Sequence, residues 1–315
     1  MKYITDLREG EMISETYFCK QKQALKTKAG KSYYSLLLQD KTGTLDAKIW
    51  DLGAGIDHFE QMDYIHIDGQ VTSFQGALQL NIKRLRRSQE GEYDPADFMP
   101  MTSRNVEEMY RELLGYAGKV KEPHMRALIS AFFVEDKDFV QRFKKHSAAK
   151  SVHHGFIGGL LEHTLGVVKM CDYMADQYAI INRDLLLAAA MFHDIGKLKE
   201  LSSFPENDYT DEGQLLGHIY MGAEMVNEKL RKIPGFPVKM ANEIIHCILA
   251  HHGELEYGSP KKPALAEALA LNLADNADAK MQTMTETLNA SDEKEWIGFQ
   301  RLFDLNLRKT SDYTK

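Results

Sequence analysis

Alternating apolar and polar positions dominate the first ninety residues of the chain. The runs SYYSLLLQD (32–40), TLDAKIWD (44–51) and DYIHIDGQVTSF (63–74) alternate with a period of two, as half-buried strands do. Lys41-Thr42-Gly43 joins the first two runs as a hairpin turn, and ALQLNIKRLRR (77–87) follows a turn at Gln75-Gly76. Several short strands in so little sequence predict a small closed barrel over residues 1–90.

The pattern becomes helical after an acidic, turn-rich stretch over residues 91–102, which we interpret as a linker. Ser103, with Glu107 and Glu108 close behind it, is typical of a helix start, and apolar residues then recur at spacings of three and four. We therefore predict a multidomain α and β protein, in which the barrel is followed by an all-α domain over residues 103–315.

The last helix is predicted over residues 292–309. It would place Trp296, Phe299 and Phe303 on one stripe. Such a stripe is more often packing than function.

Composition and charge fit an ordinary globular protein, with 43% hydrophobic and 27% charged residues. No apolar run reaches the roughly 20 residues of a membrane span, and MKYITDLREGE lacks the apolar region of a signal peptide, so we expect a cytoplasmic protein without a membrane partner. Cys19, Cys171 and Cys247 lie too far apart for a disulfide framework or a thiolate zinc cluster. The net charge of −7 argues against general attraction to nucleic acid, but it does not exclude local basic stripes.

The most apolar run, LLLAAAMF (185–192), leads directly into His193 and Asp194. It is too apolar for a surface helix, so it should be a buried helix that carries this pair into the interior. Neighbouring helical residues point about 100° apart, so both side chains can serve one cavity only near a helix end, which Ile195-Gly196 would supply. For an isolated His-Asp pair, a simple buried hydrogen bond is the better interpretation.

Four further segments change that balance, because each places a metal-type side chain among apolar neighbours. They are GGLLEHT, LLGHIYMGAE, ILAHHGE and LNLADNADAK. An unpaired imidazole or carboxylate in such a setting would be costly, and a metal would satisfy it. The candidate ligands are His163, His193, Asp194, His218, His251, His252 and Asp275. Seven such residues in this order point to bound ions.

The ordered pattern H…HD…H…HH…D resembles the HD-domain phosphohydrolases that hold two metals, here with a core over about 146–282. The resemblance implies a first metal site made by His163, His193, Asp194 and Asp275. It implies that His218, His251 and His252 complete a second site, with Asp194 bridging the two.

Longer strings extend the resemblance over nearly the whole chain. LLLQDKTGTLDAKIWD is similar to OB-folds of the nucleic-acid-binding type. Behind it, KSVHHGFIGGLLEHT, HDIGK, GHIYMGAE, HHGELEYGSPKKP and ADNADAK resemble the YhaM-type 3′-to-5′ exoribonucleases. This resemblance implies that RNA is degraded from its 3′ end.

Candidate nucleic-acid contacts lie on the barrel and near KSVHH. Lys20, Lys22, Lys26 and Lys28 surround a predicted first-to-second-strand loop, Lys83 and Arg84 lie in KRLRR, and Tyr33 could stack on a base. Such loops line the binding face of OB-folds. Lys150, His153 and His154 are weaker candidates, and a capping or packing role is as good for the two histidines.

Mixed histidine and carboxylate ligands suit manganese or ferrous iron better than magnesium. We expect two divalent ions, with Mn²⁺ the first choice and Fe²⁺, Co²⁺ or Mg²⁺ as alternatives. Two ions about 4 Å apart could activate water and clamp phosphoryl oxygens during in-line displacement. Asp194 and Lys197 would be catalytic, with Lys197 a phosphate contact or else a solvated lysine, and Asp278 would support the ligand Asp275.

The ligand pattern predicts a metal-dependent phosphodiesterase or phosphomonoesterase, and the resemblance implies a 3′-to-5′ exoribonuclease that releases nucleoside 5′-monophosphates. Single-stranded RNA is the expected partner, with single-stranded DNA and a homo-oligomer left open. The enzymatic alternative is a cyclic-dinucleotide or nucleotide phosphohydrolase, for which a basic barrel would be superfluous. The other alternative is a nucleic-acid-binding factor whose metals are structural.

Overall fold

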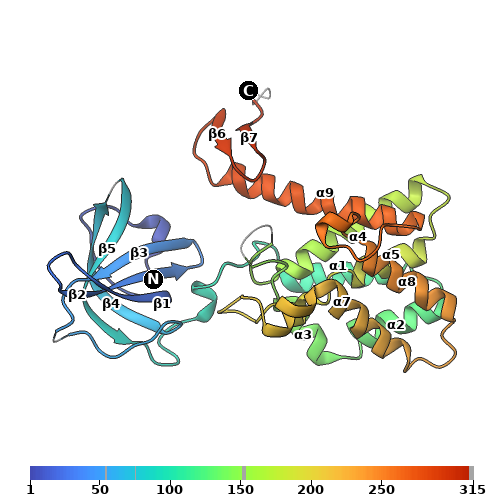
Figure 1. Cartoon of the computed structure of the whole chain (residues 1–315), viewed down its shortest axis with the longest axis horizontal. Helices are drawn as coiled ribbons and strands as arrows, with labels where there is room; N and C mark the ends of the chain where they lie inside the picture. The colour runs from blue at the N-terminus through green and yellow to red at the C-terminus, as the bar shows by residue number, and fades with distance from the viewer. Residues whose placement is uncertain (54, 75, 151–153, 312–315) are drawn as a thin grey trace. The chain divides into compact units, whose positions relative to one another are not determined.

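The computed structural model describes the chain except for residues 54, 75, 151–153 and 312–315 (Figure 1). It divides into two compact units. The first comprises residues 1–101 with 204–206, and the second begins at Thr102 and contains the remaining residues.

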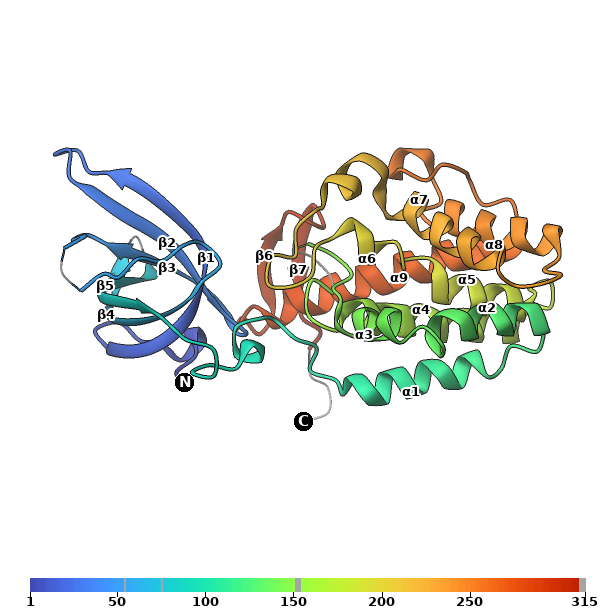
Figure 2. The same ribbon diagram turned by 90° about the horizontal axis from the view of Figure 1, so that it is seen from below.

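The first unit is a closed barrel of five strands in the order β1-β2-β3-β5-β4 (Figure 2). The strands are β1 (Met12–Lys26), β2 (Ser32–Asp40), β3 (Gly43–Ile49), β4 (Tyr64–Phe74) and β5 (Ala77–Arg87). Strands β3 and β5 pair in parallel, and the other neighbours are antiparallel. This is the five-stranded Greek-key arrangement of an OB-fold, so the predicted barrel is confirmed. Two short 3₁₀ helices, η1 (Ile4–Asp6) and η2 (Pro95–Asp97), flank it.

Alternation along the strands places the barrel core as the sequence predicts. On β4, Ile65, Ile67 and Val71 are fully buried, while His66, Asp68 and Gln70, which point to the other side, are partly exposed. The predicted hairpin turn after Asp40 also forms, because the Asp40 carboxylate accepts hydrogen bonds from the backbone N–H groups of Thr42 and Gly43.

The lysine-rich stretch around the loop from β1 to β2 is mostly strand. Strand β1 continues to Lys26, so Lys20, Lys22 and Lys26 lie on a strand, and only Lys28 belongs to the connecting loop over residues 27–31. The long pairing of β1 with β2 extends the strand through the lysine-rich stretch.

The second unit is built from helices around one apolar core. They are α1 (Val106–Ala117), α2 (Pro123–Phe133), α3 (Lys137–Lys145), α4 (Gly159–Gln177), α5 (Arg183–Phe192), α6 (Lys197–Glu200), α7 (Asp211–Leu230), α8 (Val238–Ala250), η3 (Leu255–Tyr257) and α9 (Ala266–Asn289). Helix α5 is central, since every residue from Leu185 to Phe192 is buried. It packs against α2, α4, α8 and α9, so the predicted buried helix is confirmed.

Helix α1 begins later than predicted. Its N-cap is Asn105, whose side chain accepts a hydrogen bond from the Glu108 backbone N–H at 3.1 Å. The N-cap is thus two residues further along the chain than Ser103, at a residue type as favourable there as serine.

The predicted last helix is wrong. Residues 292–309 instead contain an antiparallel hairpin of β6 (Trp296–Gln300) and β7 (Leu305–Arg308), carried at the end of α9 (Figure 1). Gly298 adopts a left-handed φ of +83° at a bulge, which an α-helix cannot include, and the surrounding aromatic residues favour strands. Trp296 and Phe299 are each 60% exposed, so they form no packing stripe, and the second unit is not all-α.

Within the ranges that the structure describes, no helix combines the length and apolar character needed to cross a membrane.

Candidate metal centre and active site

Helix α5 ends directly before His193 and Asp194, and both side chains are buried, as predicted. Gly196 follows this helix end, but glycine is needed there for a reason other than ending the helix. Its backbone is right-handed helical, with φ −61°, so it is no left-handed helix stop. A Cβ at Gly196 would lie 2.0 Å from the His218 carbonyl oxygen and 2.6 Å from the Gly222 nitrogen. Glycine is required there because the chain after Asp194 packs directly on the backbone of α7.

Five imidazoles around Asp194 share one orientation. Each Nδ1 lies 2.7–2.9 Å from an oxygen atom of the protein. The five pairs are His163 with Asp278 Oδ2, His193 with the Ala190 carbonyl, His218 with Glu200 Oε1, His251 with the Ile248 carbonyl, and His252 with the Tyr257 carbonyl. Carbonyl oxygens and ionised carboxylates only accept, so each Nδ1 carries a proton and Nε2 is the ring nitrogen left to bind a metal. This arrangement of an oriented imidazole is typical of metal ligands.

The Asp194 carboxylate lies between two groups of these histidines. Its Oδ2 is 3.3 Å from His163 Nε2 and 3.5 Å from His193 Nε2. Its Oδ1 is 3.5 Å from His218 Nε2 and 3.6 Å from His251 Nε2. Each carboxylate oxygen therefore faces a different pair of imidazoles.

The remaining predicted ligands join these two groups. Asp275 Oδ1 lies 3.2 Å from His163 Nε2 and 3.9 Å from His193 Nε2. The ligand-type atoms of His252, His218 and His251 lie within 4.8 Å of one another. The structure thus brings together all seven residues that the sequence predicts as metal ligands.

The unpaired polar atoms of this cluster show that the residues fit a divalent cation. Among the described residues, Asp194 Oδ1, His218 Nε2 and His251 Nε2 are buried without a hydrogen-bond partner. His163 Nε2 and His193 Nε2 face each other at 3.2 Å. Buried lone pairs without a donor are costly, and nitrogen and oxygen ligands around one space would be satisfied by divalent metal.

Burial and neighbouring charges shift the members of the cluster in different directions. Burial disfavours the charged forms of His163 and His251, but the neighbouring carboxylates raise the pKa of both imidazoles above the ordinary value. Burial works against ionisation of Asp194, but the Lys197 ammonium and the imidazoles hold the pKa of its carboxyl well below the usual range. Burial lowers the pKa of His193 to about 4, and burial together with His251 and His218 lowers the pKa of His252 to about 4. Both imidazoles are therefore neutral near pH 7, which is the form that binds metal.

Lys197 is not the solvated lysine of the alternative interpretation. Its side chain is 14% exposed, and its Nζ lies 2.6 Å from Asp194 Oδ2. Burial disfavours the charged ammonium, but the adjacent Asp194 carboxylate raises the pKa of Lys197 above its ordinary value.

Asp278 supports the cluster from behind the ligands. It accepts hydrogen bonds from His163 at 2.8 Å and from His154 at 3.0 Å, so it orients His163 directly. His154 is only 2% exposed, which contradicts the predicted nucleic-acid contact and favours its packing alternative. His153 lies outside the described residues.

Glu200 is a supporting residue that sequence reasoning missed. It accepts from both the backbone and the ring of His218, each at 2.9 Å. No spacing in the sequence signals this role, because a non-helical Gly217 with φ 72° bends α7 and brings His218 to the short helix α6.

A cavity of about 530 Å³ opens beside the cluster. The predicted residues that line it are His163, Asp194, Lys197, His252 and Asp275. The sequence did not single out its other lining residues, Tyr257, Asn272, Asn276, Ala279 and Lys280. This is the candidate active site.

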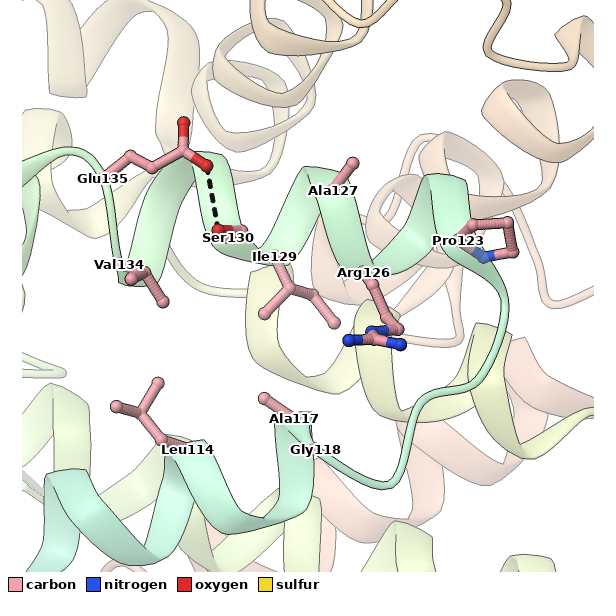
Figure 3. Close-up of a pocket in the computed structure, with 10 residues that line it drawn as sticks. All are labelled: Leu114, Ala117, Gly118, Pro123, Arg126, Ala127, Ile129, Ser130, Val134 and Glu135. Atoms are coloured by element: carbon pink, nitrogen blue, oxygen red, sulfur yellow. Dashed lines mark hydrogen bonds between the residues drawn. The ribbon is translucent and has the colours of Figure 1, made fainter.

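A second cavity of equal volume lies between α1 and α2 (Figure 3). Its polar side chains are Arg126, Ser130 and Glu135, and the Ser130 hydroxyl donates to the Glu135 carboxylate at 2.9 Å. None of the predicted metal ligands is among the described residues that line it, so it has no comparable chemistry.

The candidate nucleic-acid contacts on the barrel differ in how far their side chains are exposed. Lys22 is largely buried, with Nζ 2.5 Å from the Phe59 carbonyl oxygen and 4.3 Å from the Phe59 ring centre. It therefore has a structural role, unlike the exposed Lys26 and Lys28. The other predicted cations of the barrel, Lys20, Lys83 and Arg84, are also exposed.

The predicted contacts Tyr33 and Lys150 both have partners within the protein. Tyr33 stacks on Trp50 with ring centres 4.6 Å apart, and Trp50 is 44% exposed. In the second unit, Lys150 Nζ lies 2.5 Å from Asp208 Oδ1, so this lysine is already paired with a carboxylate.

Comparison with known proteins matches the segment that carries this cluster and nearly the whole chain. The HD domain family model matches residues 160–280. The chain is 32% identical over 312 residues to the 3′-5′ exoribonuclease YhaM of Listeria monocytogenes, covering 98% of this chain and 97% of the relative. The 3′-5′ exoribonuclease YhaM of Listeria innocua is 32% identical over 311 residues, with the same coverage.

Two solved structures are similar to one part of the chain each. The HD domain of the L. monocytogenes phosphodiesterase PgpH is 18% identical, with a TM-score of 0.28, and covers 52% of this chain and 75% of its own. The second OB-fold domain of replication protein A from Methanococcus maripaludis is 18% identical, with a TM-score of 0.24, and covers 29% of this chain and 98% of its own. Both TM-scores are low, so the fold assignment rests on the strand pairing and helix order described above.

The matched HD segment contains all seven clustered ligand-type residues, and the identity to the two Listeria exoribonucleases runs through both the barrel and the helical unit. The chain belongs to the family of the 3′-5′ exoribonuclease YhaM.

Proposed function

We propose that this protein is a metal-dependent 3′-to-5′ exoribonuclease that hydrolyses single-stranded RNA to nucleoside 5′-monophosphates at a site for two divalent ions. The observation that carries the proposal is the position of Asp194, whose two carboxylate oxygens face two separate pairs of imidazoles. A carboxylate in that position can bridge two cations.

The two groups of ligands define what each side chain would hold. One ion would be held by His163, His193 and Asp275, the other by His218, His251 and His252, and both by Asp194. The nitrogen and oxygen donors favour Mn²⁺, with Fe²⁺, Co²⁺ and Mg²⁺ as alternatives. When bound, such ions lower the pKa of water and neutralise charge on a phosphoryl group.

The surrounding residues would hold this chemistry in place. Asp278 and Glu200 fix the rings of His163 and His218. Lys197 uses one donor on Asp194, and its ammonium has two more with which to reach a phosphate in the cavity.

The barrel would bind the single-stranded RNA. Neutralising Lys26 and Lys28 together should weaken binding of long RNA and reduce the dependence of affinity on salt, because each phosphate contact releases counterions. Cleavage of a very short phosphodiester should be unchanged. Filter binding across a salt series tests this, with Lys41→Ala as the control, since Lys41 is already paired with Asp97 at 2.8 Å. Unchanged affinity in the double variant would make Lys26 and Lys28 an ordinary solvated surface.

Direction and products test the activity itself. Metal-stripped protein with manganese restored should shorten 5′-labelled single-stranded RNA progressively from the 3′ end, while protein without added metal should not. The products should be nucleoside 5′-monophosphates without 2′,3′-cyclic phosphate, because the attacking oxygen comes from water and not from the RNA 2′-hydroxyl. Parallel lanes with magnesium and with single-stranded DNA establish the preferred metal and sugar. Early release of the labelled 5′ nucleotide, or cyclic phosphate products, would contradict the proposal.

A further inference from the structure

One wall of the active-site cavity is formed by helix α9. Asn272, Asn276, Ala279 and Lys280 line the cavity beyond the ligand Asp275. Residues four apart on a helix lie on the same face, so Asn276 and Lys280 point along one stripe. The cavity, at about 530 Å³, has the size of pockets that hold a small-molecule ligand, and could therefore hold an RNA end.

The charged and polar groups of this wall are not equally available. The Asn272 amide donates to the His251 carbonyl at 2.7 Å, so it holds the protein together. Lys197, the other lysine that lines the cavity, is paired with Asp194 at 2.6 Å. Lys280 is exposed and makes no hydrogen bond or ion pair with any residue in the described part of the chain. Its ammonium is therefore available to an anion in the cavity.

The position of Lys280 along α9 indicates which anion this is. Lys280 follows Asp275 by five residues, which is about 7.5 Å along the helix axis. Lys280 thus lines the same cavity as the cluster, more than one helical turn further along α9 than Asp275. The nucleoside released from a 3′ end has no further phosphate on its far side, so the second phosphate near the cluster belongs to the strand that remains.

We propose that Lys280 binds the phosphate one nucleotide upstream of the scissile phosphate and thereby positions the RNA end for hydrolysis. This inference rests on the proposed exoribonuclease function and adds a substrate-binding residue to it.

Removing the charge of that single upstream phosphate tests the assignment. Two 5′-labelled RNAs would be compared, one with a neutral methylphosphonate at the linkage upstream of the terminal one and one with an ordinary phosphate there. Both RNAs carry a 2′-O-methyl group on the nucleotide whose 3′-oxygen forms this upstream linkage, because a free 2′-hydroxyl would attack the methylphosphonate. For the wild-type protein, the methylphosphonate should lower kcat/KM of the first cleavage about tenfold, the order expected when one charge-assisted hydrogen bond at an open site is lost.

The Lys280→Ala variant should lose about the same factor on the ordinary RNA, mainly through KM, and should no longer distinguish the two RNAs. Lys280→Arg should keep the distinction. Lys239→Ala is the matched control, because Lys239 is an exposed lysine of α8 that does not line the cavity. Equal metal content and thermal unfolding of the variants would show that the fold is intact.

Two results would overturn the assignment while leaving the exoribonuclease proposal in place. They are a Lys280→Ala variant as sensitive to the methylphosphonate as the wild type, and a wild-type protein that does not distinguish the RNAs. If the wild type shortens neither RNA from its 3′ end, the proposed function itself is contradicted and the Lys280 assignment is lost with it.

Discussion

Asp194→Ala should abolish RNA hydrolysis, lowering turnover by about a thousandfold or more, because metal assistance supplies several kcal/mol of transition-state stabilisation. In the wild type, the two carboxylate oxygens of Asp194 face the two groups of histidines, so neither ion would be held correctly without this side chain. RNA binding by the barrel should remain largely unchanged. Single-turnover cleavage with manganese and filter binding measure the two properties separately. A folded variant with near-normal turnover would rule out the shared carboxylate.

The control for this prediction must separate lost chemistry from lost stability. Asp194→Ala also leaves the buried Lys197 ammonium unpaired, and breaking such a pair can cost about 3–5 kcal/mol of unfolding free energy. Asp194→Asn keeps the shape and should be equally inactive. Asp172→Ala removes another buried carboxylate of the same unit, which pairs with Lys119 at 2.5 Å and with Arg183. This variant should lose stability but keep measurable turnover.

Gly196→Ala should destabilise the helical unit by about 3 kcal/mol or more, at the upper end of the cost of overpacking a core. The new Cβ would lie 2.0 Å from a backbone oxygen of His218 and 2.6 Å from the backbone of Gly222, and backbone cannot move aside as a flexible side chain can. Displacing α7 would also displace His218, one of the proposed metal ligands. The free energy of unfolding, measured with denaturant, and the metal content of the purified protein should therefore both fall.

Gly115→Ala provides the matched substitution in the same unit. Gly115 lies inside α1, and a Cβ there would meet nothing within 4 Å. Alanine is favoured over glycine in a helix, so this variant should gain about 0.5–1 kcal/mol. If Gly196→Ala proved as stable as the wild type, the close approach of α7 to the chain after Asp194 would be wrong.

The pattern of apolar and polar residues was sufficient to place the barrel strands and helix α5. The alternation on β4 placed Ile65 and Ile67 inside the barrel, because side chains of a strand alternate between two sides. The run over residues 185–192 has no polar face, so its helix had to be buried on all sides. Periodicity failed at residues 292–309, where a helical spacing of aromatics coincided with a glycine that must adopt a left-handed backbone.

The sequence by itself determined the barrel, the buried helix α5 and the identity of the seven ligand-type residues, because residue chemistry and short-range periodicity are local properties. Only the tertiary structure decided how those side chains are arranged around one another. Asp194 faces two groups of histidines, Glu200 orients His218, and Lys280 is left available in the cavity while Lys197 is paired. These relations join α5, α6, α7 and α9 across long separations in sequence, and they depend on helix packing and on backbone contacts such as that at Gly196. No local pattern encodes such distances, since they are set by how the helices pack around a common core.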